Sequence, residues 1–463
     1  MTLQPKQDLK SATAYQVVIY PDLKSKKFTT LQNLHRFGMT TKVDPADKFP
    51  RISDDELLTL VQKQTFNYFW DFGHPVSGLA RERNTSGDIV TSGGTGFGIL
   101  AMVVAVERGF ISREQAIERL TKMTDFLKNK TKTYHGVFPH WLNGATGETV
   151  AFSTYDDGGD LVETAFIAQG LVCVKQYFKN GNAQEKRLAA KADRLWKEID
   201  FDWYRNGKNV LYWHWSPKNE WRMNFPVYGF NECLIMYVMA AASPTHGITK
   251  QVYDEGWAMN GKIKSPRSYQ DINLQFFHQG NAPHGGPMFW SHYSFLGLNP
   301  NGLKDQYGDY GLETKNQALI NYQWCVDNPL GYKGYGENSW GLTSSYSIKG
   351  YAGHAPAKQK DLGVISPTAA VSSIVYTPEQ SKAAMRHWYL NMKDKVWGKY
   401  GFFDAFSETA NWYNKGYLGI DKGPEVVMLE NYRSGLLWKL FMQDEDVKKG
   451  LNSLGFESPY LKK

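Results

Sequence analysis

The residues best suited to chemistry are four carboxylates that fall within eight positions, Asp156, Asp157, Asp160 and Glu163. Asp160 and Glu163 stand three residues apart at the start of an apolar segment. A helix that begins there places both on one side of its first turn. Clustered carboxylates raise one another's pKa, which can keep one of them protonated as a general acid near neutral pH. The segment is therefore a candidate acid–base site.

The same residues also have an explanation that involves no catalysis. Asp160 as the N-cap and Glu163 three positions later would form a capping box, and both charges would complement the helix dipole. Capping does not explain Asp156 and Asp157, nor the two glycines that separate them from Asp160. Both interpretations stay open on the residues alone.

Further carboxylates stand outside this cluster. Glu232 opens an apolar segment directly after an aromatic run, so it could cap a helix or lie in an apolar pocket. Asp404 and Asp421 lie on segments expected to be loops. Glu430 lies in an otherwise apolar helical segment, where Arg433 three positions later could pair with it.

Composition favours a saccharide cleft and argues against other partners. Aromatic residues make up 14% of the chain, with 15 Trp and 27 Tyr, and such faces suit sugar rings, although a large core would also use them. The net charge of +7 is spread over 463 residues without a basic stripe, so we expect no nucleic-acid partner. No run of 18 apolar residues occurs, which predicts no membrane span.

Motifs for metals, nucleotides and serine nucleophiles are missing from the sequence. Cys173, Cys233 and Cys325 are widely spaced in apolar contexts, so we expect buried small side chains rather than a zinc site or a disulfide framework. Residues 93–98 fail the dinucleotide fingerprint, and residues 256–262 lack the Ser or Thr that ends a P-loop. We expect neither a metal nor an organic cofactor.

The elements that position these residues are predicted to be helices. Residues 1–50 show little periodicity and are expected to be an N-terminal extension, whereas residues 51–463 form a single domain. Capping boxes at Ser53 and Ser112 indicate helix starts, and residues 424–442 are expected to form one long helix. Helices joined by long aromatic loops, with few short strands, are typical of an all-α toroid whose loops build a cleft.

Several blocks of sequence, in this order, resemble a known family. They are residues 69–83, 95–98, 135–144 and 156–165, followed by residues 420–424 together with 430–433. This set is similar to the glucoamylase-like bacterial proteins of glycoside hydrolase family 144. The resemblance implies an (α/α)6 toroid and an anomer-inverting hydrolase of β-1,2-glucan or its oligosaccharides, in a family with endo-acting and sophorose-releasing members.

The resemblance also implies roles for single residues. Acidic positions of the family pocket match Asp156, Asp160, Glu163, Glu232 and Asp421, and Lys422 stands where the family pattern has glutamine. We expect Glu163 or Glu232 to be the general acid, and Asp160 or Asp421 to position or deprotonate the attacking water. The expected substrate-binding residues are Asp156, His140, Trp141, Trp290, Arg83 and Glu430.

Location and oligomeric state follow from the resemblance as expectations. Members are typically exported by Bacteroidetes-type bacteria, so a periplasmic enzyme without its signal segment is expected, with the cytoplasm as the alternative. We expect a monomer whose partner is the glucan.

Three other functions stay open. An exo-acting α-glucan hydrolase of the glucoamylase type would cleave starch instead of sophoro-oligosaccharides. A glycoside phosphorylase would need phosphate for turnover. A non-catalytic saccharide-binding protein would bind without turnover.

Overall fold

The computed structural model describes residues 4–7, 9, 14–27, 29–41 and 48–461, and the chain divides into two units, Met1–Arg51 and Ile52–Lys463. The described part of the first unit contains two antiparallel strands, β1 (Ala14–Ile19) and β2 (His35–Thr40), in which Ala14 pairs with Thr40. Every residue of β2 is exposed, which explains why the sequence gives no alternating apolar signal there.

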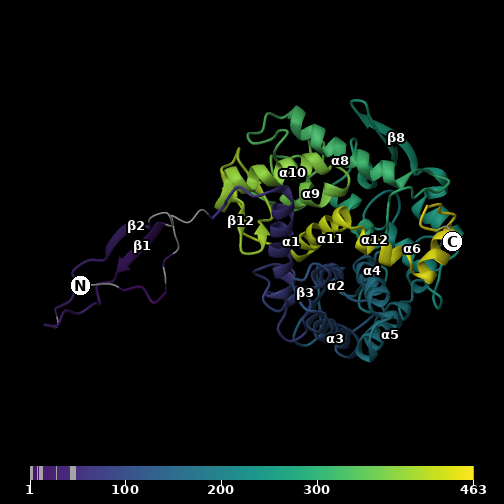
Figure 1. The fold of residues 1–463 in the computed structure, drawn as a ribbon, viewed down its shortest axis with the longest axis horizontal. Coiled ribbons are helices and arrows are strands. Elements are labelled where there is room, and N and C mark those ends of the chain that lie inside the picture. The colour runs from purple at the N-terminus through teal and green to yellow at the C-terminus, as the bar shows by residue number, and fades with distance from the viewer. Residues whose placement is uncertain (1–3, 8, 10–13, 28, 42–47, 462–463) are drawn as a thin grey trace. The chain divides into compact units, whose positions relative to one another are not determined.

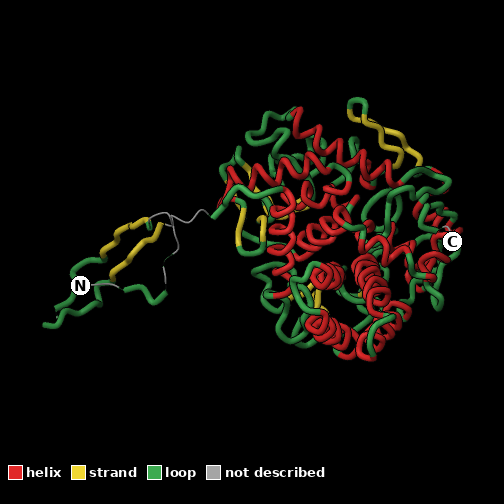
Figure 2. The backbone as a smooth tube through the Cα atoms, in the orientation of Figure 1, coloured by secondary structure: helices red, strands yellow, loops and turns green. Residues whose placement is uncertain are grey.

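The second unit is mostly helical, with short strands between the helices, as predicted (Figures 1 and 2). Its longer helices are α1 (Asp54–Trp70), α2 (Ser92–Glu107), α3 (Arg113–Asn129), α4 (Leu161–Phe178), α5 (Ala183–Lys197), α6 (Leu234–Ala242), α8 (Tyr310–Asp327), α10 (Pro378–His387), α11 (Gly419–Arg433) and α13 (Glu445–Leu454). Shorter helices are α7 (Lys250–Val252), α9 (Pro367–Ser372) and α12 (Leu436–Met442).

The strands form small antiparallel sheets in the loops. A three-stranded sheet has the order β3 (Ile89–Thr91), β4 (Trp141–Asn143) and β5 (Thr149–Val150). The pairs are β6 (Gly159–Asp160) with β7 (His214–Trp215), β8 (Lys264–Tyr269) with β9 (Ile272–Phe276), β10 (Ser344–Ser347) with β11 (Gly350–Gly353), β12 (Trp397–Gly398) with β13 (Gly401–Phe402), and β14 (Phe406–Ser407) with β15 (Trp412–Tyr413). Strand β3 leads directly into α2, and β6 leads directly into α4, so each strand fixes where a helix starts.

Helix α2 packs against both α4 and α11 in the core. Its residues from Ser92 to Ala105 are all buried, which accounts for a sequence that is apolar on every face. Phe97 of α2 contacts Phe166 of α4, with ring centroids 5.1 Å apart. This packing holds the N-termini of α2 and α4 close to each other, and both termini belong to the site described below.

The predicted helix starts at Ser53 and Ser112 are confirmed. Ser53 Oγ accepts a hydrogen bond from the Glu56 N–H (3.3 Å), and Glu56 Oε2 accepts one from the Ser53 N–H (2.8 Å). Ser112 and Gln115 form the same reciprocal pair at the start of α3. These signals are local, so sequence alone suffices to read them.

The prediction of one helix over residues 424–442 is wrong. Helix α11 begins five residues earlier, at Gly419, and Pro424 lies inside it at the cost of one backbone hydrogen bond. The chain leaves the helix after Arg433, and Gly435 adopts a left-handed conformation (φ 68°) before α12 begins. The break separates two helices that the apolar periodicity alone cannot distinguish.

Two further expectations concern the cysteines and the membrane. Cys173, Cys233 and Cys325 are buried with free thiols, as predicted. Within the described ranges, none of the helices combines the length and hydropathy that crossing a bilayer requires.

Candidate active site

A cavity of about 450 Å³ brings together five of the predicted site residues from distant parts of the chain. Among the residues that line it are Arg83, His140, Trp141, Glu163 and Glu232. They come from the segment before β3, from β4 and the residue that precedes it, from the first turn of α4 and from the approach to α6. Glu163 and Glu232, which are far apart in the sequence, thus line the same cavity.

Asp160 caps helix α4, whereas the Glu163 side chain lines the cavity. Asp160 is the N-cap of α4, and its Oδ1 accepts the Glu163 N–H (2.9 Å), so this half of the capping prediction is confirmed. The Glu163 side chain does not return to Asp160. Its Oε2 accepts hydrogen bonds from the Gly93 N–H (2.6 Å) and from Thr91 Oγ1 (3.2 Å) at the N-terminus of α2. A Cβ at position 93 would overlap this carboxylate, so the close approach requires glycine.

Two glutamates of the cavity, Glu163 and Glu232, have raised pKa values. Burial raises the pKa of Glu163 to about 7, while the nearby charge of His140 opposes that shift. Burial raises the pKa of Glu232 to about 8, and the charges of Glu163 and Asp160 add to the effect. Glu232 accepts no side-chain hydrogen bond from another described residue, so nothing comparable to the Gly93 contact stabilises its anion. At neutral pH the Glu232 carboxyl is therefore mainly protonated.

His140 is held between two aspartates. Its Nδ1 lies 3.1 Å from Asp156 Oδ2 and 2.9 Å from Asp160 Oδ2, and Asp160 Oδ2 also accepts the Trp213 Nε1–H (2.8 Å). Burial lowers the pKa of His140, but Glu163 and the two aspartates raise it well above its usual value. The ring stacks on Phe152, with centroids 4.1 Å apart. His140 is therefore an imidazolium with a fixed orientation at the cavity wall.

The arrangement of His140, Asp156 and Asp160 also bears on metal binding. One donor atom from each lies within 4.8 Å of the others, which is a spacing that could hold a cation. Nδ1 of His140, however, is directed at Asp156 Oδ2 and Asp160 Oδ2, and a proton on that nitrogen can be shared by these two oxygens. The expectation of a site without metal stays a prediction.

Asp421 lies in the first turn of α11, beside a second acid, Asp404. Burial and the charge of Asp404 raise the pKa of Asp421 well above its usual range, and burial raises that of Asp404 to about 7. Asp404 Oδ2 accepts the Tyr346 N–H (2.8 Å). The side chain of Lys422 donates to Glu425 Oε1 (2.7 Å) and to the Phe402 carbonyl (2.6 Å). Asp404 and Asp421 are therefore two buried acids that share a proton.

Tyr293 connects the two groups of acids. Its side chain is buried and lines the cavity. Burial raises its pKa well above the usual value, and the charges of Asp421, Glu163 and Glu232 contribute to that shift. Asp421 itself is almost fully buried, but its neighbours Leu418 and Ile420 line the cavity. The Asp421 carboxyl thus lies within electrostatic reach of the hollow that Glu163 and Glu232 border.

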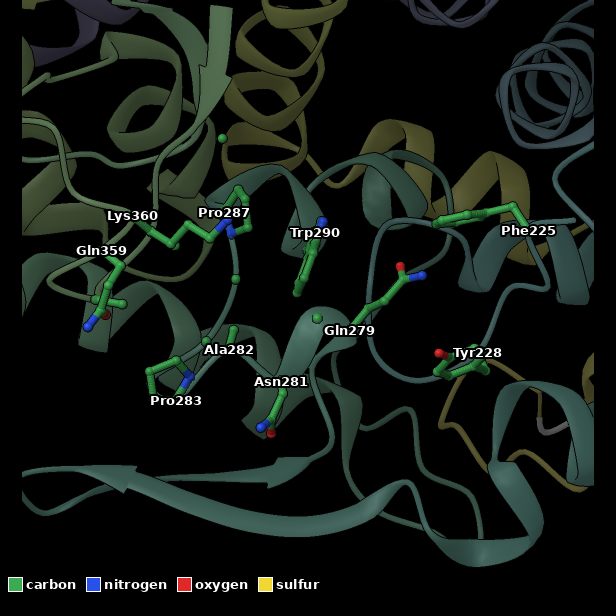
Figure 3. Close-up of a pocket in the computed structure, with 16 residues that line it drawn as sticks. Phe225, Tyr228, Gln279, Asn281, Ala282, Pro283, Pro287, Trp290, Gln359 and Lys360 are labelled. Carbon is green, nitrogen blue, oxygen red and sulfur yellow. The ribbon is translucent and has the colours of Figure 1, made fainter. Parts of the chain in front are cut away.

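Three predicted substrate contacts, Asp156, Trp290 and Glu430, do not line this cavity. Trp290 lines a neighbouring cavity, where Figure 3 shows its indole among the lining residues. Glu430 is fully buried in an ion pair with Arg108, at 2.6 Å between Oε2 and Nε and 2.9 Å between Oε1 and Nη2. The predicted sugar contact for Glu430 is therefore wrong. Its suggested partner Arg433 pairs instead with Asp55 (2.6 Å).

Replacing Arg108 with methionine is expected to destabilise the fold without changing the chemistry. The substitution leaves the buried Glu430 carboxylate without its cation, which should lower the free energy of unfolding by about 3 kcal/mol. Denaturant unfolding measures the loss, and kcat/KM of the folded variant should equal that of the parent. A loss of activity at unchanged stability would mean that Glu430 contributes to substrate binding after all.

The cavity also contains residues that the sequence did not single out. They are Glu82, Phe152, Trp213, Phe289, Tyr293, Ser344 and Tyr351. Phe152, Trp213 and Tyr351 belong to the long loops whose composition suggested a cleft, whereas Phe289 and Tyr293 lie on short 3-10 helices. Composition does not say which rings face inward. Glu82 forms a bidentate ion pair with Arg83, which is itself a wall residue.

Comparison with known proteins connects this geometry to a family. A family model described as "Putative glucoamylase" matches residues 224–445. The endo-β-1,2-glucanase of Chitinophaga pinensis, in a complex with sophorotriose and glucose, is 60% identical, with a TM-score of 0.87, over 89% of this chain and 100% of its own. The chain belongs to the glucoamylase-like family.

Two other relatives show the range of this similarity. The exo-β-1,2-glucooligosaccharide sophorohydrolase of Parabacteroides distasonis is 41% identical over 421 residues, which is 87% of the glucoamylase-like chain and 58% of that relative. The chain thus spans little more than half of that relative's length. The endo-β-1,2-glucanase of Talaromyces funiculosus, in a complex with sophorose, is only 10% identical, and its TM-score of 0.62 over 87% of this chain shows a shared fold.

Proposed function

We propose that this glucoamylase-like protein hydrolyses β-1,2-glucan or its oligosaccharides with inversion of the anomeric carbon. The carrying observation is that Glu232, whose pKa burial raises to about 8, lines the same cavity as Glu163 and Tyr293, and that the charges of Glu232 and Asp421 both act on Tyr293. Inverting hydrolysis needs one acid to protonate the leaving oxygen and one base on the opposite face to activate water. The substrate class comes from the names of the relatives.

Glu232 is assigned as the general acid. Its pKa of about 8 keeps the proton available at neutral pH, and a 7% exposed side chain reaches the cavity while staying poorly hydrated. Glu163 suits the role less, because its Oε2 is held as an acceptor by the Gly93 N–H and Thr91. Raised pKa values of this kind are characteristic of acid catalysts in glycosidases.

Asp421 is assigned as the base that activates the attacking water, with Asp404 as the acid that shares its proton. Asp160 suits the role less, because its Oδ1 caps α4 and its Oδ2 accepts from both Trp213 and His140. Asp160 is a positioning residue for that reason. With one proton shared between them, the Asp404–Asp421 pair still carries one carboxylate, and this carboxylate accepts the proton of the attacking water.

The remaining wall residues are assigned to sugar binding. His140, as an imidazolium, and Arg83 offer hydrogen-bond donors to hydroxyl groups, and Trp141 offers a ring face. Asp156 is 3% exposed and pairs with His140, so it acts by orienting that ring rather than by touching the substrate. The finer resemblance to glycoside hydrolase family 144 supports an (α/α)6 toroid and a periplasmic location as further parts of this proposal.

The pH dependence of kcat/KM is expected to be a bell whose alkaline limb falls through about pH 8. Glu232 must be protonated, so the rate falls as pH rises through about 8. The aspartate pair must be able to take the water's proton, so the rate also falls at lower pH, where the pair takes up a second proton. In Asp404→Asn the acid limb should move to lower pH, because Asp421 loses the neighbouring charge that raises its pKa. A rate that keeps rising beyond pH 9 would exclude Glu232 as the acid.

The product profile on linear β-1,2-glucan tests the proposed function. Chromatography should show sophoro-oligosaccharides of defined length, with no turnover of starch and no dependence on phosphate. Cleavage of starch would favour a glucoamylase-type hydrolase, and phosphate-dependent release of glucose 1-phosphate would favour a phosphorylase. Tight binding of the glucan without any product would leave a saccharide-binding protein.

A further inference from the structure

A second cavity of about 640 Å³ adjoins the candidate active site, and no residue assigned to the chemistry lies in it (Figure 3). Its volume is within the range of small-molecule sites. Three aromatic residues line it, Phe225, Tyr228 and Trp290. Phe225 is 40% exposed and Tyr228 is 36% exposed, which is unusual for large rings in a concave surface unless they serve binding.

The two cavities share walls. Phe225 of the second cavity contacts Trp213 of the first edge-on, with ring centroids 5.5 Å apart. Phe289 and Trp290 are consecutive residues of one helical turn, and the first lines the catalytic cavity while the second lines its neighbour. The two cavities therefore lie next to each other, with aromatic side chains forming the wall between them.

A strand pairing and a hydrogen bond also connect residues of the two cavities. Ser344 of the catalytic cavity pairs with Gly353 of the second cavity across strands β10 and β11. Asn231, the residue before Glu232, donates from Nδ2 to Gln279 Oε1 of the second cavity (2.7 Å). The second cavity is thus attached directly to the segment that carries the proposed acid.

The Trp290 indole packs against Gly286, whose backbone N–H and carbonyl groups are both hydrogen-bonded. It lies so close to Gly286 that any Cβ there would overlap the ring. The Gly286 N–H donates to His278 Nδ1 (3.1 Å), and His278 Nε2 bonds Glu313 Oε1 (2.9 Å). Gln317 Nε2 donates to the Gly286 carbonyl (2.9 Å). A ring fixed in this way presents a preformed face, which lowers the entropy lost on binding.

The polar lining indicates a neutral, hydroxyl-rich ligand. Gln279, Asn281 and Gln359 contribute amides, and Lys360 contributes a single cation. Gln359 and Lys360 make no side-chain hydrogen bond to any described residue, so both are available to a ligand. No carboxylate is among the described lining residues, so the cavity has no acid–base pair of its own. Ring faces flanked by amides suit a sugar better than an anion.

We propose that this second cavity binds glucosyl residues of the same β-1,2-glucan chain that the catalytic cavity cleaves, beyond the residues at the scissile linkage. The inference rests on the proposed function. Sugars stack on Trp290 and on the rings opposite it, while the amides and Lys360 bond hydroxyl groups. The consequence is a preference for long chains, because short oligosaccharides fill the catalytic cavity alone.

The test compares chain lengths in a Trp290→Ala variant. On long β-1,2-glucan we expect kcat/KM to fall by about tenfold, through KM, as for loss of an aromatic anchor. On the shortest oligosaccharide that the parent hydrolyses, kcat/KM should change by less than about twofold. Gly286→Ala keeps the indole but displaces it, and should show the same selective loss. Trp203→Ala is the matched control, an exposed indole that lines neither cavity.

The outcomes separate this inference from the proposed function. An equal loss on long and short substrates would mean that Trp290 acts at the cleavage site, and no loss on either would mean that no sugar uses this cavity. Both results overturn the inference while the parent still hydrolyses β-1,2-glucan. A parent without activity on any length of that glucan would overturn the proposed function first. Thermal unfolding of each variant identifies losses that come from misfolding.

Discussion

Replacing Glu232 with glutamine is expected to lower kcat on β-1,2-glucan by about a hundredfold to ten-thousandfold, the usual contribution of a general acid. The amide has nearly the same shape and fits the same buried position, but it has no acidic proton for the leaving oxygen. KM should change little, because the ground state needs no proton transfer. Steady-state kinetics on the purified variant measures both quantities.

Two controls make the Glu232→Gln result specific. A sophorosyl fluoride needs little help with its departing group, so the variant should lose much less activity on it than on glucan. Glu430→Gln is the matched substitution at a buried glutamate outside the cavity, and it should keep its turnover despite some loss of stability. Unchanged turnover of glucan by Glu232→Gln would remove Glu232 from the mechanism.

Replacing Asp421 with asparagine is expected to cost about a hundredfold or more in kcat, because no base then accepts the proton of the attacking water. The Asp404 carboxyl stays in place, but in the assigned roles Asp421 activates the water and Asp404 modulates it. Asp404→Asn should therefore cost much less than Asp421→Asn. The ratio of the two kcat values is the measurement.

Azide separates loss of the base from loss of the acid. As an anion it can attack the anomeric carbon without giving up a proton, so it should restore part of the activity of Asp421→Asn and form a glycosyl azide. It should not rescue Glu232→Gln, where the leaving oxygen lacks its proton. Wild-type activity in Asp421→Asn would shift the base role to Asp160, the other residue considered for it.

Local signals in the sequence predicted the parts of the site that depend on neighbouring residues. Asp160 caps α4, and its first turn carries Glu163, because both facts follow from a three-residue spacing at a helix start. The same reasoning misjudged where the Glu163 side chain goes. Its partner Gly93 lies 70 positions earlier in the chain, so the contact exists only after α2 and α4 pack together.

Long-range pairing limited the other predictions in the same way. Glu430 and Arg108 are separated by 322 positions, and no local sequence pattern near either residue predicts their ion pair. The helical spacing instead suggested Arg433, which the structure pairs with Asp55. The sequence identified Asp404 only as an acid on a loop, because its raised pKa arises from burial beside Asp421 in the folded chain. Resemblance to a family grouped Glu163, Glu232 and Asp421 as one predicted set, which periodicity alone could not do.

Aromatic loops illustrate a further limit. The sequence placed Trp290 at the substrate, and the structure places it one wall away from the catalytic cavity. Trp290 and Phe289 are adjacent, so a turn of the backbone decides which ring faces which hollow. Loop conformation of this kind is not encoded in a short periodic pattern.

The configuration of the first product tests the central claim most directly, namely that acid and base act from opposite faces of a β-linkage. Proton NMR of linear β-1,2-glucan, recorded immediately after enzyme is added, resolves the anomeric signals before mutarotation equalises them. We predict that the α-anomer appears first at the newly formed reducing end. Initial formation of the β-anomer would mean retention through a covalent intermediate, and would contradict the roles assigned to Glu232 and Asp421.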